Sequence, residues 1–100
     1  MRVLVLFNLK PGVAIADYEK WAREVDLPTV NGLGSVEKFE VLRTTGLLIG
    51  DGPAPYQYVE MLDISDPDGF GADCSSATMQ KVAGEFGAMV DAVFMTVESL

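Results

Sequence analysis

Apolar and polar positions alternate with two different periods along the chain, and each period predicts a different element. The first segment, MRVLVLFNL, is apolar on both alternating faces, which is typical of a strand covered on both sides. Apolar residues then recur at helical spacing over residues 15–25, with Glu19 and Arg23 paired on the outer side. We expect this helix to end near residues 26–28, because proline disfavours helical backbone at the residue before it.

The rest of the chain predicts two more strands, a second helical region and a last strand. Residues 35–44 (SVEKFEVLRT) alternate like a half-exposed edge strand, and residues 55–64 (PYQYVEMLDI) are apolar enough on both faces to be central. A helical region begins near Asp66 and becomes firmer from Ser75 or Ser76, which are good N-cap residues. The segment VDAVFMTVES closes the chain as a strand.

The element order is therefore β-α-β-β-α-β, which predicts a ferredoxin-like α+β fold in one domain over residues 1–100. In this topology the first and third strands are central in an antiparallel sheet, and two helices cover only one face. Large bare apolar faces are rare, so we expect a second copy of the sheet to cover the other face. The sequence thus predicts a homodimer, a dimeric α+β barrel.

The charge of the chain excludes several classes of partner. The net charge is −8, with six basic and six acidic residues in residues 1–50 but only Lys81 against nine acids in residues 51–100. A nucleic-acid binder needs a basic face, and an anionic membrane surface is disfavoured for the same reason. The first apolar run is too short for a signal sequence, so we expect a cytoplasmic protein. Cys74 is the single cysteine, which excludes an internal disulfide.

Glu60 stands in the middle of the apolar strand 55–64. Alternation places it on the same face as Tyr56, Tyr58 and Leu62. An ionised carboxylate on an apolar face is unfavourable without partners, and desolvation would raise its pKa toward the range useful for general acid/base chemistry. The alternatives are a strand end open to solvent, or a pairing with Arg43 on the neighbouring strand.

Two stretches, DYEKWAREVDLPTVNGLGSVEKFEVLR and PYQYVEMLDI, resemble the RedY-like (HapK-like) family of the dimeric α+β barrel superfamily. This family is associated with prodigiosin-type pigment pathways. The resemblance implies a role in bacterial secondary metabolism, on a small aromatic or pyrrole-like intermediate, with no metal and no organic cofactor. The superfamily includes cofactor-free monooxygenases, lactone isomerases, polyketide cyclases, haem enzymes and ligand-binding domains, so the fold alone does not select an activity.

Some members of this superfamily carry His-x-Pro after the first helix, where this chain has Asp26-Leu27-Pro28 and no histidine at all. Histidine-based acid/base chemistry and a proximal haem histidine are therefore excluded. Proton transfer must use carboxylates, tyrosines, lysines or water, and the candidate catalytic residues are Glu60, Tyr58 and Asp26. An aspartate in this position also commonly caps a turn.

The candidate substrate-binding residues are Tyr18, Trp21, Tyr56, Asn31 and Arg43. Superfamily cavities lie between helices and sheet, so the resemblance places Tyr18 and Trp21 as a wall against Tyr58 and Glu60. Each candidate also has an ordinary structural interpretation. The aromatic side chains suit core packing, Asn-Gly is a turn signal, and an arginine on an edge strand is commonly exposed.

Two functions remain open from the sequence. The first is a cofactor-independent tailoring enzyme in which Glu60 transfers a proton, of isomerase, dehydratase, cyclase or monooxygenase type. The second is a non-catalytic dimeric carrier for such an intermediate. Leu47, Leu48 and Ile49 in a Gly/Pro-rich connection suit either a lid or a partner contact. A calcium site is not expected, because the acids between residues 63 and 73 lack the spacing of a calcium loop.

Overall fold

The computed structural model describes all residues, 1–100. Its elements in chain order are β1 (Arg2–Leu9), α1 (Ile15–Trp21), the π-helical segment η1 (Ala22–Asp26), α2 (Leu27–Asn31), β2 (Val36–Arg43), β3 (Tyr58–Ile64), α3 (Pro67–Cys74), α4 (Ala77–Met89) and β4 (Val90–Val97).

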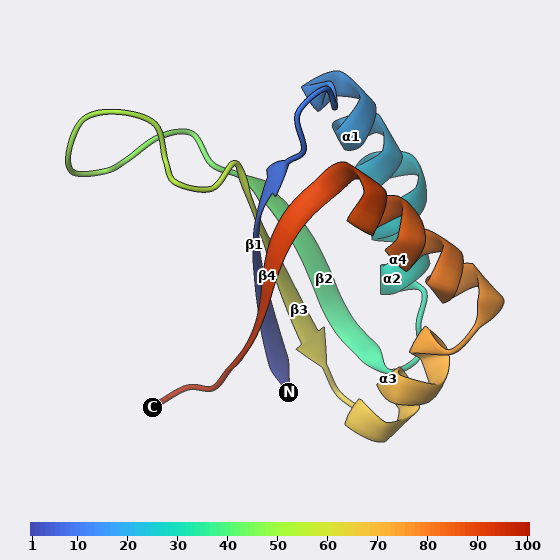
Figure 1. The fold of residues 1–100 in the computed structure, drawn as a ribbon. Helices are drawn as coiled ribbons and strands as arrows, with labels where there is room; N and C mark the ends of the chain where they lie inside the picture. The colour runs from blue at the N-terminus through green and yellow to red at the C-terminus, as the bar shows by residue number, and fades with distance from the viewer.

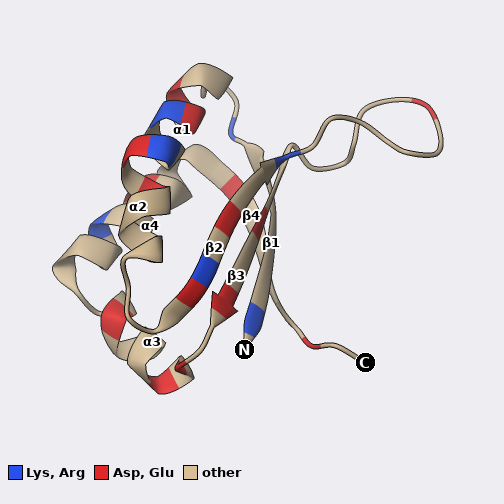
Figure 2. Cartoon of the chain, turned by 180° about the vertical axis from the view of Figure 1, so that it is seen from behind, with Lys and Arg blue, Asp and Glu red and all other residues tan.

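The four strands form one antiparallel sheet in the order β2-β3-β1-β4. The first and third strands are central, which confirms the predicted topology. All the helices lie on one face of the sheet, and the long connection between β2 and β3 extends away from the body as a loop (Figure 1). Figure 2 shows charged residues along α1 and along the edge strand β2.

The core between helices and sheet consists of two clusters. The first surrounds Phe7, which is fully buried and has its ring centroid 5.3 Å from that of Tyr58 and 5.1 Å from that of Phe86. The second cluster includes Phe39 and Leu62. Along β3 the alternation runs from Tyr58 in the first cluster to Leu62 in the second, so the position between them belongs to Glu60.

The helical starts in the second half follow the predicted caps. The Asp66 side chain accepts a hydrogen bond from the backbone N–H of Gly69, with Pro67 at the first helical position of α3. The Ser76 hydroxyl accepts the backbone N–H of Met79 at 3.1 Å and so begins α4.

The first helical region does not end near residues 26–28, so that prediction is wrong. The chain remains helical through η1 and α2 to Asn31, and the residue before the proline, Leu27, has φ −58° and ψ −50°. The Leu27 N–H bonds to the Ala22 carbonyl, five residues back, which is the π-helical pattern. Pro28 then falls in the first turn of α2, where an amide hydrogen is not needed.

Two strand predictions also need correction: strict alternation over residues 35–44 places Val36 and Lys38 on one face, and the next strand was predicted to begin at residue 55. Val36 pairs with Ile64 while Lys38 pairs with Asp63, so a bulge lies between them. The extra residue turns Val36 into the core, where it is buried, instead of leaving it on the same face as Lys38. The third strand begins at Tyr58, later than the predicted residue 55, because the residues before it belong to the long loop.

The face of the sheet opposite the helices is apolar and uncovered. Side chains exposed on it include Leu42 at 42%, Met61 at 37% and Val93 at 46%. An ion pair between Arg2 and Asp63, 2.8 Å, lies at one end of this face. In this fold no helix is both long enough and apolar enough to span a membrane.

Candidate functional site

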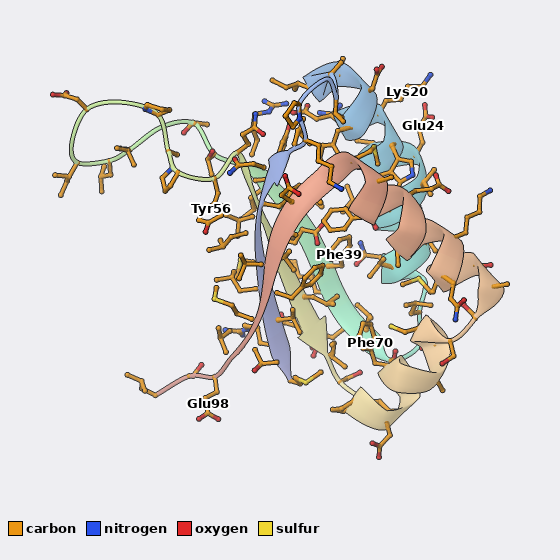
Figure 3. The ribbon with its side chains drawn as sticks, in the orientation of Figure 1. Lys20, Glu24, Phe39, Tyr56, Phe70 and Glu98 are labelled. Atoms are coloured by element: carbon orange, nitrogen blue, oxygen red, sulfur yellow. The ribbon has the colours of Figure 1, made fainter.

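A cavity of about 690 Å³ lies between the helices and the sheet. Fifteen of its 20 lining residues are hydrophobic. Two of them, Phe39 and Phe70, lie between the two layers in Figure 3. The cavity reaches the edge strand β4, where Phe94 lines it and is still 65% exposed, so this edge is its mouth.

Two carboxyl groups project into this apolar space. Glu60 lies on β3, in register with Val5 on β1 and Val41 on β2, so its position is central in the sheet. Asp26 comes from the last position of η1, on the helical layer above. Both residues are 5% exposed and line the cavity. Asp26 makes no side-chain capping bond, so the turn-capping interpretation does not describe it.

The two groups are close enough for one to donate a hydrogen bond to the other when it is protonated. Burial, followed by the charge of Asp26, raises the pKa of Glu60 to about 8. Burial also raises the pKa of Asp26, to about 6, while its hydrogen bond with Glu60 opposes the rise. Near neutral pH the pair therefore holds one proton and one negative charge.

Tyr18 lies next to this pair. Its side chain is fully buried, and its hydroxyl has no hydrogen-bond partner within the protein. Burial raises the pKa of Tyr18 well above the ordinary value, with further contributions from the charges of Glu60 and Asp26. The hydroxyl therefore stays protonated beside the carboxyl pair, although Tyr18 does not itself line the cavity.

Tyr58 and Arg43 donate hydrogen bonds to the same residue, Glu19, for which the sequence predicts only a surface pair with Arg23. The Tyr58 hydroxyl donates to Glu19 Oε2 at 2.8 Å, and Arg43 Nε donates to the same oxygen at 2.8 Å. The hydrogen bond from Arg43, followed by that from Tyr58, lowers the pKa of Glu19 to about 2. Arg43 therefore pairs with Glu19, and the predicted alternative of a pair with Glu60 is wrong.

Tyr18, Tyr58 and Arg43 line a separate, smaller pocket of about 130 Å³ and not the large cavity, and the remaining candidates also lie outside the cavity lining. Trp21 is half-buried and donates from Nε1 to Glu85 at 2.9 Å. Asn31 joins α2 to β2, because its side chain accepts the Phe39 N–H at 2.9 Å and donates to the Phe39 carbonyl at 3.0 Å. Tyr56 lies at the base of the long loop, away from the helices (Figure 3).

No site residue was predicted on the last strand, although β4 lines the mouth of the cavity. Phe94 pairs in register with Val5, which pairs on its other side with Glu60, so the three stand in one row across the sheet. The apolar alternation of the last strand indicates which of its residues face the helices, but it does not indicate that the cavity opens at this edge of the sheet. No group of three or more His, Cys, Asp or Glu side chains is arranged to hold a metal ion.

Fold and site together define a ferredoxin-like α+β protein with an acid pair in an apolar cavity. The chain belongs to the family of the REDY-like protein HapK, whose model matches residues 1–100. It is similar to the crystal structure of HapK from Hahella chejuensis, with 29% identity, a TM-score of 0.78 and coverage of 100% of this chain and 93% of that one. The search of curated proteins found no match.

Two more distant structures share the fold. One is a dabb family protein with a ferredoxin-like fold from Mesorhizobium loti, at 16% identity and a TM-score of 0.73, covering 99% of this chain and 95% of that one. The other is SnoaB, a cofactor-independent oxygenase from Streptomyces nogalater, at 15% identity and a TM-score of 0.71, covering 99% and 93%. They confirm the ferredoxin-like α+β fold predicted from the sequence.

Proposed function

We propose that this chain is a cofactor-independent tailoring protein of bacterial secondary metabolism that moves a proton on a bound aromatic or pyrrole-like intermediate. The observation that carries this proposal is the carboxyl pair of Asp26 and Glu60, buried together in an apolar cavity. Membership of the HapK family supports the metabolic setting, and the cofactor-independent SnoaB supports chemistry of this kind on the fold. A prodigiosin-type pathway is the setting that the family resemblance favours.

The pair supplies an acid and a base at once. With one proton between them, Glu60 in its protonated form gives a proton to the substrate while the Asp26 carboxylate accepts one. The site then holds the same number of protons before and after the reaction, as an isomerisation requires. The apolar walls of the cavity exclude water from the bound substrate.

Tyr58 and Arg43 have a positioning role in this proposal. The Tyr58 hydroxyl is committed to Glu19, so its contribution to the site is the ring that packs against Tyr18, with centroids 4.9 Å apart. Arg43 holds Glu19 in place from the edge strand. Together they fix the ring of Tyr18 and thereby the direction of its hydroxyl.

Glu60→Gln tests the acid/base assignment, because it keeps the shape of the side chain and removes its titration. We expect turnover of the pathway intermediate to fall by about 100-fold or more, measured as product formed in single-turnover mixing. Glu24→Gln, an exposed position on the same helical segment as Asp26, is the control and keeps the wild-type rate. A wild-type rate in Glu60→Gln would show that Glu60 moves no proton.

A second candidate function is a non-catalytic carrier that delivers the intermediate to another enzyme. It is favoured by the tip of the long loop, where Leu48 is 100% exposed and Ile49 is 87% exposed. Trp21 reports ligand binding, since its ring is stacked on that of Phe86, which lines the cavity. Tight binding of an intermediate in a Trp21 fluorescence titration, with no product after long incubation, would identify the carrier.

The open face of the sheet supports the proposal of a homodimer with two sheets packed against each other. A structural relative from Thermobifida fusca, at 19% identity and a TM-score of 0.67, covers 96% of this chain and 89% of that one and is described as a dimeric ferredoxin-like protein. Burying the open face against a second copy would remove Leu42, Met61 and Val93 from water.

Met61→Lys tests the homodimer, because it places a charge in the middle of the open face. We expect the wild type to sediment as a dimer and Met61→Lys as a folded monomer in analytical ultracentrifugation. Leu48→Lys makes the same change at the loop tip and keeps the wild-type mass. A wild type that sediments with the mass of one chain would contradict the dimer.

A further inference from the structure

The two buried polar side chains that line the cavity, Asp26 and Glu60, are both acids. Its five residues that are not hydrophobic are Asp26, Glu60, Gly87, Asp91 and Thr96. No lysine or arginine lines it. Arg43, on the neighbouring edge strand, is held by Glu19 and does not line this cavity. The cavity therefore offers a ligand negative charge and hydrogen-bond acceptors but no positive counter-charge.

Glu60 also has an unused bonding position inside the cavity. Its Oε2 is buried and has no hydrogen-bond partner, although a buried carboxyl oxygen without a partner is unfavourable. Glu60 is only 5% exposed, so bulk water does not satisfy this oxygen. A ligand that donates a hydrogen bond to Oε2 would satisfy it.

On the basis of the proposed function, we infer the substrate class: the cavity takes an apolar, flat ligand with a positively charged nitrogen that donates an N–H to Glu60 Oε2. The acceptor is the unpartnered oxygen, and the apolar walls take the rest of the ligand. An ammonium, an amidinium or a protonated nitrogen heterocycle has this chemistry. Charge-assisted hydrogen bonds of this kind are the stronger ones in proteins.

The other two charge classes fit less well. An anion such as a carboxylate or phosphate would face Asp26 and Glu60 with no cation to balance it. A neutral hydrocarbon would suit the walls but would leave Glu60 Oε2 without a partner. A cation leaves the cavity neutral when the carboxyl pair holds one proton, because the charges then cancel.

A bound cation also changes the proton content of the site. The titratable groups that face Glu60 are Tyr18 from α1 and Asp26 from η1, with Cys74 of α3 further along the lining. Asp91 of β4 pairs with Asn8, so its side chain leaves the sheet on the opposite face, and the lining residues of α4 carry no charge. A positive charge beside Glu60 lowers its pKa, so binding near pH 7.5 releases part of a proton. A neutral ligand has no such effect.

Three matched probes test the inference: 1-naphthylmethylamine as the cation, 1-naphthylmethanol as the neutral form and 1-naphthylacetate as the anion. Isothermal titration calorimetry at pH 7.5, in two buffers of different ionisation enthalpy, gives affinity and proton release together. We expect the amine to bind about tenfold or more tightly than the alcohol, the anion not to bind, and only the amine to release protons.

Glu60→Gln should still bind the alcohol but prefer the amine by less than about threefold, whereas Glu24→Gln keeps the wild-type preference. Binding of the anion as tightly as the amine, an unchanged preference in Glu60→Gln, or no binding by any probe would overturn the inference. The readout is binding, so it is separate from the turnover test. Amine selectivity with a wild-type rate in Glu60→Gln would refute the proposed catalysis and keep the ligand class.

Discussion

Glu60→Gln is expected to make the protein more stable at pH 8 and to remove most of the decline in its stability between pH 6 and pH 8. The reason is the buried carboxyl pair. In the unfolded chain Glu60 ionises with a pKa near 4.5, whereas in the folded protein burial and the charge of Asp26 raise it to about 8. Folding therefore opposes the ionisation of Glu60, and glutamine has no ionisation to oppose.

The sign follows from proton linkage. A carboxyl group whose pKa is higher in the folded than in the unfolded state resists ionisation in the folded protein. The free energy of unfolding therefore falls as the pH rises from 4.5 through about 8, where Glu60 ionises. Asp26, whose pKa rises from 3.8 to about 6 on folding, lowers the free energy of unfolding in the same way over that pH range. Glu19, whose pKa is lowered to about 2, acts oppositely and only below its unfolded value of 4.5. Between pH 5 and pH 8 the carboxyl pair determines the trend.

The effect is large because a rise in pKa from 4.5 to about 8 corresponds to about 4 to 5 kcal/mol of unfolding free energy above pH 8. Urea unfolding of wild type and Glu60→Gln, at a series of pH values from 5 to 9, measures it directly. Glu24→Gln, at an exposed position, keeps the wild-type pH profile. A wild type as stable at pH 8 as at pH 5.5 would contradict the prediction.

The same substitution is thus expected to abolish proton transfer and to strengthen the fold. Active sites commonly hold groups that are poor choices for stability alone. Observing both effects in one variant would distinguish a functional carboxyl pair from a structural one, because removing a structural pair destabilises the protein.

Phe7→Ala is the second large effect, and it acts on the fold rather than on the site. Phe7 is fully buried between layers and touches Tyr58, Tyr18 and Phe86, with ring centroids 5.1 to 5.6 Å away. Truncation leaves a cavity among three aromatic rings that cannot close around it. We expect a loss of about 3 to 5 kcal/mol in the free energy of unfolding, measured in urea at pH 6.

Phe94→Ala is the matched control for Phe7→Ala. It makes the same truncation on the same face of the sheet, but Phe94 is 65% exposed at the edge. We expect a loss of less than about 1 kcal/mol. If the two variants lost similar free energy, Phe7 would not be the centre of the core.

The strands and the faces of the sheet were predictable, because period-two alternation depends only on local geometry. Val5 and Phe7 point to the helices, and Glu60 shares that face, as the pattern indicates. The position of Glu60 among apolar residues was therefore visible in the sequence. Its pairing with Asp26 was not, since that depends on how the helical layer sits over the sheet.

Long polar side chains were the least predictable part of the site. Arg43 and Glu19 lie 24 residues apart, and their pairing arises only when α1 packs across β2. Trp21 was expected in the site, but its N–H reaches Glu85 on the other helix. Alternation gives the direction in which a side chain leaves the backbone, but tertiary packing selects which of several partners its end meets.

The π-helical segment η1 has a consequence for comparing relatives of this chain. A π turn holds one residue more than an α turn, so a relative one residue shorter between Ala22 and Asp26 would continue as an ordinary helix. One residue corresponds to about 100° of rotation, which would turn an aspartate at this place away from the sheet. Deleting one residue between Ala22 and Asp26 is therefore expected to separate the two carboxyl groups even though both acids remain in the chain.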